Sequence, residues 1–199
     1  MGLIGVIPIV GAINLLGWTL TATDTVRGGW KELPPAGFQH LQRGVAPFVV
    51  SLAYGLVVGV LLGVLVFLIV FFALSGRAGA SLAVGLGLLS ILVFLTCWLI
   101  SLYLFAALIM ASDRLGIVKA LDPLRLFALA RANHDISLHV AVVYGLASIA
   151  VAAIGVALAF IIPFGGGLIV SLVLPAVYAI VVPSLAAFRV EPASGMAPT

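Results

Sequence analysis

The sequence predicts an all-α integral membrane protein, and three observations carry this prediction. Only 8% of the 199 residues are charged and 64% are apolar, whereas about 25% of the residues in a soluble domain are charged. Four runs contain no charged residue, and each reaches the ~20 residues that an α-helix needs to cross the hydrocarbon core. None of these runs alternates polar and apolar residues as barrel strands do. The runs are 1–23, 45–76, 78–112 and 136–188.

These runs predict five spans within a single transmembrane domain over residues 1–188. The last run is too long for one helix, and Pro163 followed by the glycines at 165–167 is expected to break it. A signal peptide requires basic residues ahead of its apolar run, and the first run has no Lys or Arg there. We therefore expect a span and not a cleaved leader. The predicted spans are 3–23, 45–74, 79–112, 137–162 and 168–188, followed by a short tail at 189–199.

The basic residues predict the orientation of these spans. Eight of the nine Lys and Arg residues lie in segments 24–44 and 113–136 and in the tail, and the remaining one is Arg77. Cytoplasmic connections carry the excess of Lys and Arg. We therefore expect a plasma-membrane protein with these three segments on the cytoplasmic side and the N-terminus outside. The same rule accounts for the net charge of +3, so nucleic-acid binding is not predicted.

An amphipathic helix lying on the cytoplasmic membrane surface is predicted over residues 122–133. Asp122 followed by Pro123 is a typical helix start, with Asp as the N-cap and Pro at the first helical position. A helical wheel separates the residues that follow into two faces, and the apolar face is expected to rest on the bilayer. The apolar face is Leu126, Phe127, Leu129 and Ala130, and the other is Arg125, Ala128, Arg131 and Ala132.

A second surface helix over 34–44 is predicted from a match at an offset of 88 residues. Leu33, Pro35 and Arg43 fall on Leu121, Pro123 and Arg131, and Tyr54-Gly55-Leu56 then falls on Tyr144-Gly145-Leu146 after a two-residue insertion. The match indicates a parallel internal repeat of span, surface helix and span. In these surface helices the basic residues are expected to attract anionic lipid headgroups: Arg43, Arg125 and Arg131.

Several short motifs carry a family resemblance over most of the chain. They are Gly17-Trp18, Arg27-Gly28, Leu33-Pro34, Gly44-Val45, Asp122-Pro123 and Arg131-Ala132-Asn133. With them the chain resembles a prokaryotic membrane family known only as domain of unknown function 4013, whose members share a Gly-aromatic pair, a Leu-Pro and a late Arg-Ala-Asn. The chain departs from that pattern at Thr21 and Asp24, where basic residues are expected, and at Pro35-Ala36. The resemblance implies no established activity.

Three glycines spaced four apart form the sharpest pattern inside a predicted span. Gly55, Gly59 and Gly63 would open a groove along one helix face, which lets a neighbouring helix backbone come close. We call these three residues the glycine ridge. It predicts helix packing, either against another span of this chain or against a second copy or another membrane protein.

No catalytic site, metal or cofactor is predicted. The chain has no H-E-x-x-H, G-x-S-x-G, phosphate loop or C-x-x-C. His134, Asp135 and His139 are the only clustered metal-ligand types; Asp135 and His139 could share a helix face, but a fourth ligand is missing. The alternative, which we favour, is that Asp135 caps the fourth span while His139 lies at headgroup depth.

Two classes of function remain after these exclusions. The favoured one is a non-enzymatic scaffold or accessory subunit that acts through helix packing, because the glycine ridge is present and no predicted span contains Asp, Glu, Lys or Arg, which are the usual mark of ion pathways. The alternative is a carrier or channel for a lipid or small hydrophobic solute. The parallel repeat and the prolines of the fifth span, Pro175 and Pro183, favour that alternative.

Overall fold

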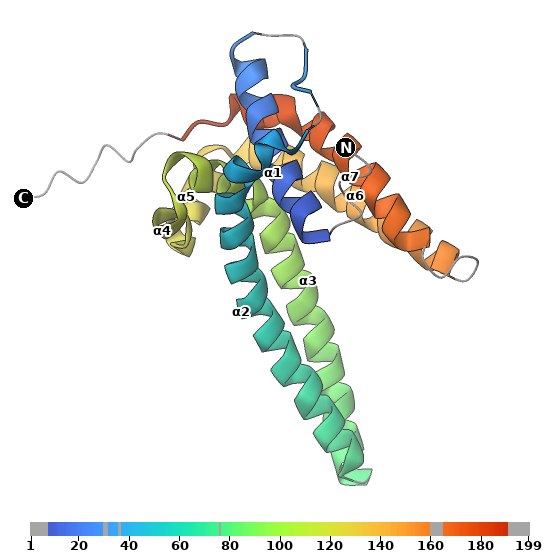
Figure 1. The fold of residues 1–199 in the computed structure, drawn as a ribbon. Coiled ribbons are helices and arrows are strands. Elements are labelled where there is room, and N and C mark those ends of the chain that lie inside the picture. The colour runs from blue at the N-terminus through green and yellow to red at the C-terminus, as the bar shows by residue number, and fades with distance from the viewer. Residues whose placement is uncertain (1–7, 30–31, 36, 76, 160–164, 191–199) are drawn as a thin grey trace, which may run out of the picture. The chain divides into compact units, whose positions relative to one another are not determined.

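The computed structural model describes residues 8–29, 32–35, 37–75, 77–159 and 165–190, and the described part belongs to the all-α class, as predicted. Its elements, labelled in Figure 1, follow one another along the chain. They are α1 (Pro8–Arg27), the 3-10 helix η2 (Phe38–His40), α2 (Leu41–Leu74), α3 (Arg77–Arg114), α4 (Ile117–Ala120), α5 (Pro123–Ala132), α6 (His134–Ala159) and α7 (Gly165–Ala187).

Three helical segments of the described residues are long and apolar enough to cross a membrane, which indicates a membrane protein. They are Phe38–Leu74, Gly79–Arg114 and His134–Ile154, and they correspond to the second, third and fourth predicted spans. The first predicted span corresponds to α1, whose described part begins at Pro8, and the fifth corresponds to α7. The total of five crossings stays a prediction.

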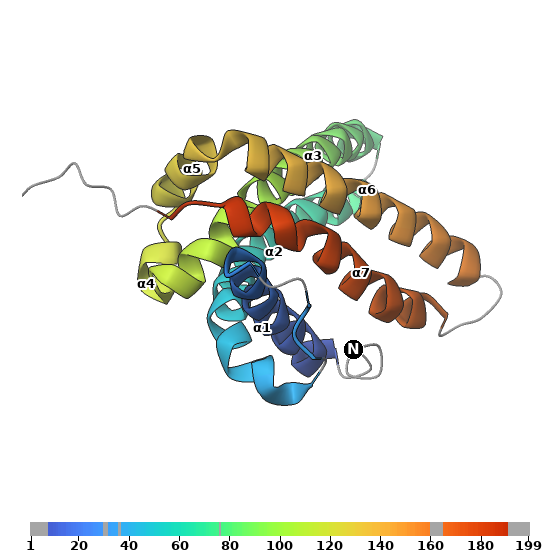
Figure 2. The ribbon, with the colours of Figure 1, turned by 90° about the horizontal axis from the view of Figure 1, so that it is seen from above.

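The chain divides into two compact units. Residues 1–50 and 102–199 form the first, which we call the core unit, and residues 51–101 form the second, which we call the hairpin unit. In the core unit α7 contacts both α1 and α6, and it runs beside α6 in Figures 1 and 2. η2 contacts α1, while α5 contacts α4 and α6. The first and last described helices of the chain therefore pack together.

The interior of the core unit is built around the middle of α1 and the end of α3. Residues 106–111 of α3 are buried on every face of the helix, and alanine at three of these six positions lets neighbouring elements approach closely. Leu20 of α1 and Phe188, just after α7, are among the largest fully buried side chains. This packing fixes the end of α3, where the charged residues Asp113 and Arg114 follow the buried segment.

Threonines make α1 polar along part of its length without leaving buried hydroxyl groups unbonded. The hydroxyl groups of Thr19 and Thr23 are buried and donate to the carbonyl oxygens of Leu15 and Thr19, at 2.8 and 2.7 Å. A threonine inside a helix commonly makes this bond to the residue four positions earlier. These two buried hydroxyl groups are thus satisfied within α1 itself.

The hairpin unit exposes most of its large apolar side chains. In it, residues 51–74 of α2 and 77–101 of α3 run beside each other (Figure 1). Leu56, Val57 and Phe67 on α2 and Leu88 and Leu92 on α3 are all exposed. Apolar surface on this scale needs a cover of lipid or of another protein.

The two predicted surface helices have different outcomes. A helix forms at the later position as α5, and the Asp122 carboxylate caps it, as predicted, by accepting from the amides of Leu124 and Arg125 at 3.0 and 3.3 Å. Its place on a membrane surface stays a prediction. The prediction of a separate helix over 34–44 is wrong, because residues 32–35 are not helical and residues 41–44 are the first turn of the long α2. His40 and Gly44 are buried against α1, so this segment is held by protein contacts.

Candidate functional site

Four charged side chains from three helices meet at one end of the core unit. Arg43 of α2 donates from Nε and Nη2 to the two carboxylate oxygens of Asp113 of α3, each at 2.9 Å, and from Nη2 to Asp24 of α1 at 2.6 Å. Arg114 pairs with Asp24 and also lies beside Asp113, with its Nε 3.3 Å from a carboxylate oxygen. We call Asp24, Arg43, Asp113 and Arg114 the ion cluster.

The charges of the ion cluster balance, with two carboxylates facing two guanidinium groups. The planar fork of Arg43 matches the Asp113 carboxylate in the two-bond geometry that makes such pairs strong. The Asp113 side chain is only 11% exposed and that of Arg43 is 30% exposed, so water screens this pair less than a surface pair. The arrangement ties α1, α2 and α3 together, and all four charged groups are used in doing so.

Two glycines bring α1 and α2 close enough for the cluster to form. A Cβ atom built on Gly17 would lie 1.8 Å from the carbonyl oxygen of His40, and one built on Gly44 would lie 1.7 Å from that of Ile13. Neither position has room for any side chain, because the obstacle is backbone. The two helices therefore cross in direct backbone contact one residue from Arg43.

The segment between α1 and α2 is hydrogen-bonded to α1 by residues of the short motifs. Trp18 donates from its indole Nε1 to the carbonyl oxygen of Pro34 at 3.0 Å. His40 donates from Nε2 to the carbonyl oxygen of Pro35 at 3.1 Å, and its Nδ1 lies 3.2 Å from the Thr21 hydroxyl. The Gly-Trp and Leu-Pro motifs thus touch each other, which gives both a structural role.

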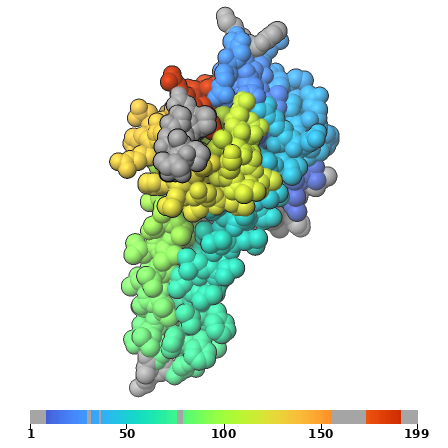
Figure 3. Space-filling view, turned by 90° about the vertical axis from the view of Figure 1, so that its left-hand side faces the viewer, coloured from blue at the N-terminus to red at the C-terminus, as the bar shows by residue number. Residues whose placement is uncertain are grey.

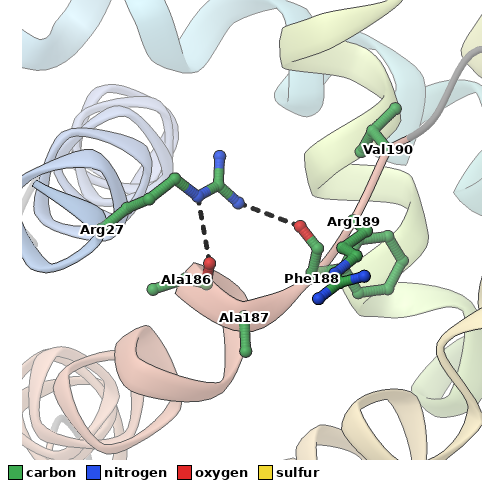
Figure 4. Close-up of a pocket in the computed structure, with 6 residues that line it drawn as sticks. All are labelled: Arg27, Ala186, Ala187, Phe188, Arg189 and Val190. Carbon is green, nitrogen blue, oxygen red and sulfur yellow. Dashed lines mark hydrogen bonds between the residues drawn. The ribbon is translucent and has the colours of Figure 1, made fainter.

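The end of α7 is held by Arg27 and Asn133. Arg27 donates from Nε to the carbonyl oxygen of Ala186 at 3.0 Å and from Nη2 to that of Phe188 at 2.9 Å (Figure 4). Carbonyl groups at a helix C-terminus lack partners within the helix, and a basic side chain satisfies them. Asn133 exchanges two hydrogen bonds with the backbone of Arg189, at 2.9 and 3.0 Å. An open cavity of about 520 Å³ lies between Arg27 and residues 186–190.

These contacts join the three segments that are predicted to share one side of the membrane. Asp24 and Arg43 belong to segment 24–44, Asp113 and Arg114 to segment 113–136, and Arg189 to the tail. Eight basic residues lie in these segments, and the acidic partners in the ion cluster come from the same segments. The side of a membrane on which this group lies stays a prediction.

The three arginines predicted to meet lipid headgroups have different environments. Arg43 is bound by two carboxylates of the ion cluster. Arg125 and Arg131 are exposed on α5. The helix face expected to rest on lipid is also different, because Leu126 and Ala130 are fully buried while Phe127 is exposed. The helical wheel alone could not show which side of α5 packs on the protein, because apolar residues lie on both sides of the helix.

The glycine ridge faces open space in the hairpin unit. A Cβ atom built on Gly55, Gly59 or Gly63 would meet nothing within 4 Å among the described residues. The packing partner predicted for the ridge within this chain is therefore absent from the hairpin unit, and packing by the ridge stays a prediction.

The candidate metal ligands have other roles or none in the described part of the chain. Asp135 is not the cap of the fourth span, because α6 already begins at His134 and Asp135 lies inside the first turn. His134 uses Nδ1 in a 3.0 Å hydrogen bond with the Tyr103 hydroxyl. Among the described residues no three His, Cys, Asp or Glu side chains are placed to hold one metal ion.

Sequence reasoning missed the ion cluster and the Gly17–Gly44 contact. One signal was present, since Asp24 stands where the family resemblance leads one to expect a basic residue, and it pairs with Arg43 and Arg114. The contact between Gly17 and Gly44 has no repeated glycine spacing that could reveal it in the sequence, because each helix contributes a single glycine to it.

Comparison with known proteins gives a family and no activity. The family described as "Protein of unknown function (DUF4013)" matches residues 1–164, and the chain belongs to that family, as its motifs indicated. No curated protein and no solved structure matches the chain.

Proposed function

We propose that this DUF4013 member is a non-enzymatic integral membrane protein that acts as a scaffold or accessory subunit through packing of its hairpin unit. The observation that carries the proposal is the open glycine ridge on α2. Its three glycines are exposed and have free space above them, surrounded by large exposed apolar side chains. Such a groove suits a helix of a second copy or of another membrane protein, because close backbone approach strengthens van der Waals contact in lipid.

The polar groups of the core unit support a structural role over a catalytic one. The charged side chains of the ion cluster bind one another, and Arg27 and Asn133 bind backbone groups at the end of α7. Polar side chains that are used in this way hold a fold together and leave the hairpin unit as the part available to partners. We place the protein in the plasma membrane of a prokaryote, with the ion cluster on the cytoplasmic side as the basic residues predict.

Replacing Gly59 with leucine tests this proposal. The leucine would fill the ridge, so we expect the complex extracted in mild detergent from membranes of the producing cells to lose mass, as measured by size-exclusion chromatography with light scattering. Gly85→Leu on α3 is the matched control, because Gly85 is also exposed and has nothing within 4 Å. A wild-type chain that runs as a lone monomer, or equal losses for the two variants, would contradict the proposal.

A carrier for a lipid or small hydrophobic solute is the second candidate, and one cavity favours it. The cavity has a volume of about 230 Å³ and lies between α6 and α7, close to Pro175. It is lined by Tyr144, Ala147, Ser148, Val151, Ala152, Leu174 and Val177. If this function is correct, Ala147→Phe should slow transfer of a fluorescent lipid between vesicles that contain the protein, while Gly59→Leu should not.

A further inference from the structure

Four large apolar side chains on α4, on α5 and in the turn between them are exposed. Val118, Leu121, Leu124 and Phe127 are spaced three residues apart, and we call them the apolar stripe. Val118 is 84% exposed and Leu124 is 81% exposed, although both are large and apolar. The α4–α5 surface faces the viewer in Figure 3, in yellow and yellow-green.

The opposite side of the same segment is fixed to the core unit. Ala120, Leu126 and Ala130 are fully buried. The carbonyl oxygen of Ala130 accepts from the Ser137 hydroxyl at 3.2 Å and from the Tyr103 hydroxyl at 3.4 Å. The inner side is therefore occupied by protein, so α5 cannot turn it to a bilayer without unpacking, and the apolar stripe is the side that stays available.

Basic side chains accompany the apolar stripe. Lys119, Arg125 and Arg131 are exposed, and within the described residues none of them forms an ion pair. The one acidic residue of segment 117–132 is Asp122, whose carboxylate is bound to the amides of Leu124 and Arg125. The segment thus offers apolar side chains together with unpaired positive charge.

We propose that α4 and α5 lie in the headgroup region of an anionic bilayer, with the apolar stripe inserted toward the acyl chains and Lys119, Arg125 and Arg131 against lipid phosphates. A bilayer provides both partners at once, since amphipathic helices with this composition bury their apolar face just below the headgroups. The long apolar helices of the same chain indicate that a bilayer is present. The inference goes beyond the scaffold role and does not depend on it.

Spin labels on the full-length protein test the inserted face. In a Cys97→Ser background, a single cysteine replaces either Leu124 or, as the matched control on α5, the exposed Ala132. The labelled protein is reconstituted in vesicles of phosphatidylcholine and phosphatidylglycerol. We expect the label at 124 to be reached by oxygen more than by a water-soluble nickel complex, and the label at 132 to show the reverse. Equal access of the nickel complex to both labels would overturn the proposal. Shielding of the label at 124 from both oxygen and the nickel complex would also overturn it, because that result would indicate a protein partner.

The requirement for anionic lipid is tested by charge removal. Short-chain phosphatidylglycerol is titrated into the detergent-solubilised protein, and the rise in unfolding temperature gives an apparent affinity. Each basic residue near an anionic surface contributes about a factor of five. We therefore expect the triple variant Lys119→Gln, Arg125→Gln, Arg131→Gln to bind at least about tenfold more weakly, with its unfolding temperature in phosphatidylcholine alone unchanged. A wild-type protein that responds equally to short-chain phosphatidylcholine would refute the anionic preference.

Discussion

Replacing Gly17 with alanine is expected to destabilise the core unit by about 3 kcal/mol or more. The new Cβ atom would lie 1.8 Å from the carbonyl oxygen of His40, so either α1 or the start of α2 must move. Overpacking usually costs about 1–3 kcal/mol when side chains can adjust, and here the obstacle is backbone. Gly44→Ala should have a similar effect, because its Cβ would lie 1.7 Å from the carbonyl oxygen of Ile13. Equilibrium unfolding of the purified full chain in mixed micelles measures both.

Gly59→Ala provides the control for these two variants. All three glycines lie in helices, but a Cβ atom on Gly59 would meet nothing within 4 Å. Alanine is favoured over glycine in a helix by roughly 1 kcal/mol, so this variant should be as stable as the wild type or more stable. If all three substitutions had the same effect, the backbone contact between α1 and α2 would be refuted.

Replacing Arg43 with methionine is the second change with a large expected effect. It leaves the mostly buried Asp113 carboxylate with Arg114 as its remaining partner in the ion cluster and removes one of the pairs of Asp24. Removing one partner of a fully buried pair costs about 3–5 kcal/mol. Because Arg43 is 30% exposed, we expect about 2 kcal/mol, with water screening the rest. The same unfolding measurement applies.

Two further variants separate the ion cluster from a general effect of charge. Arg125→Met removes an exposed arginine that has no carboxylate partner in the described part of the chain, and should leave the unfolding midpoint almost unchanged in detergent. Arg43→Lys keeps the charge but loses the planar guanidinium group that bonds Asp113 through two nitrogens. Its free energy of unfolding should therefore lie between those of the methionine variant and the wild type. A lysine variant as unstable as the methionine variant, or an equal loss for Arg125→Met, would contradict this account.

The features that depend on composition and local chemistry could be predicted from the sequence. Long uncharged runs become long helices because a backbone in lipid must satisfy its own hydrogen bonds, and this holds for α2, α3 and α6. The start of α5 was predictable because Asp122 and Pro123 act on their own first turn. The fourth and fifth predicted spans correspond to separate helices, α6 and α7, but the glycines at 165–167 lie inside the first turn of α7 and Pro163 lies outside the described residues.

The features that depend on which helices meet could not be predicted in this way. Arg43 was expected to face lipid, because nothing near it in the sequence shows that Asp24 and Asp113 surround it. The helix expected over 34–44 is instead a short 3-10 turn that leads into α2, since contact with α1 at Gly17 and Gly44 determines where the chain turns. The side of α5 that is buried was undetermined for the same reason.

The contact of α1 with α7 has a consequence for how the protein is made. Ribosomes synthesise α1 before the other described helices and α7 after them, yet the two pack together and Arg27 binds the last turn of α7. Until α7 emerges, the Arg27 side chain lacks the two carbonyl oxygens that it binds at the end of α7. The core unit can therefore close only after α7 has been made, so its completion is a late event in the folding of the chain.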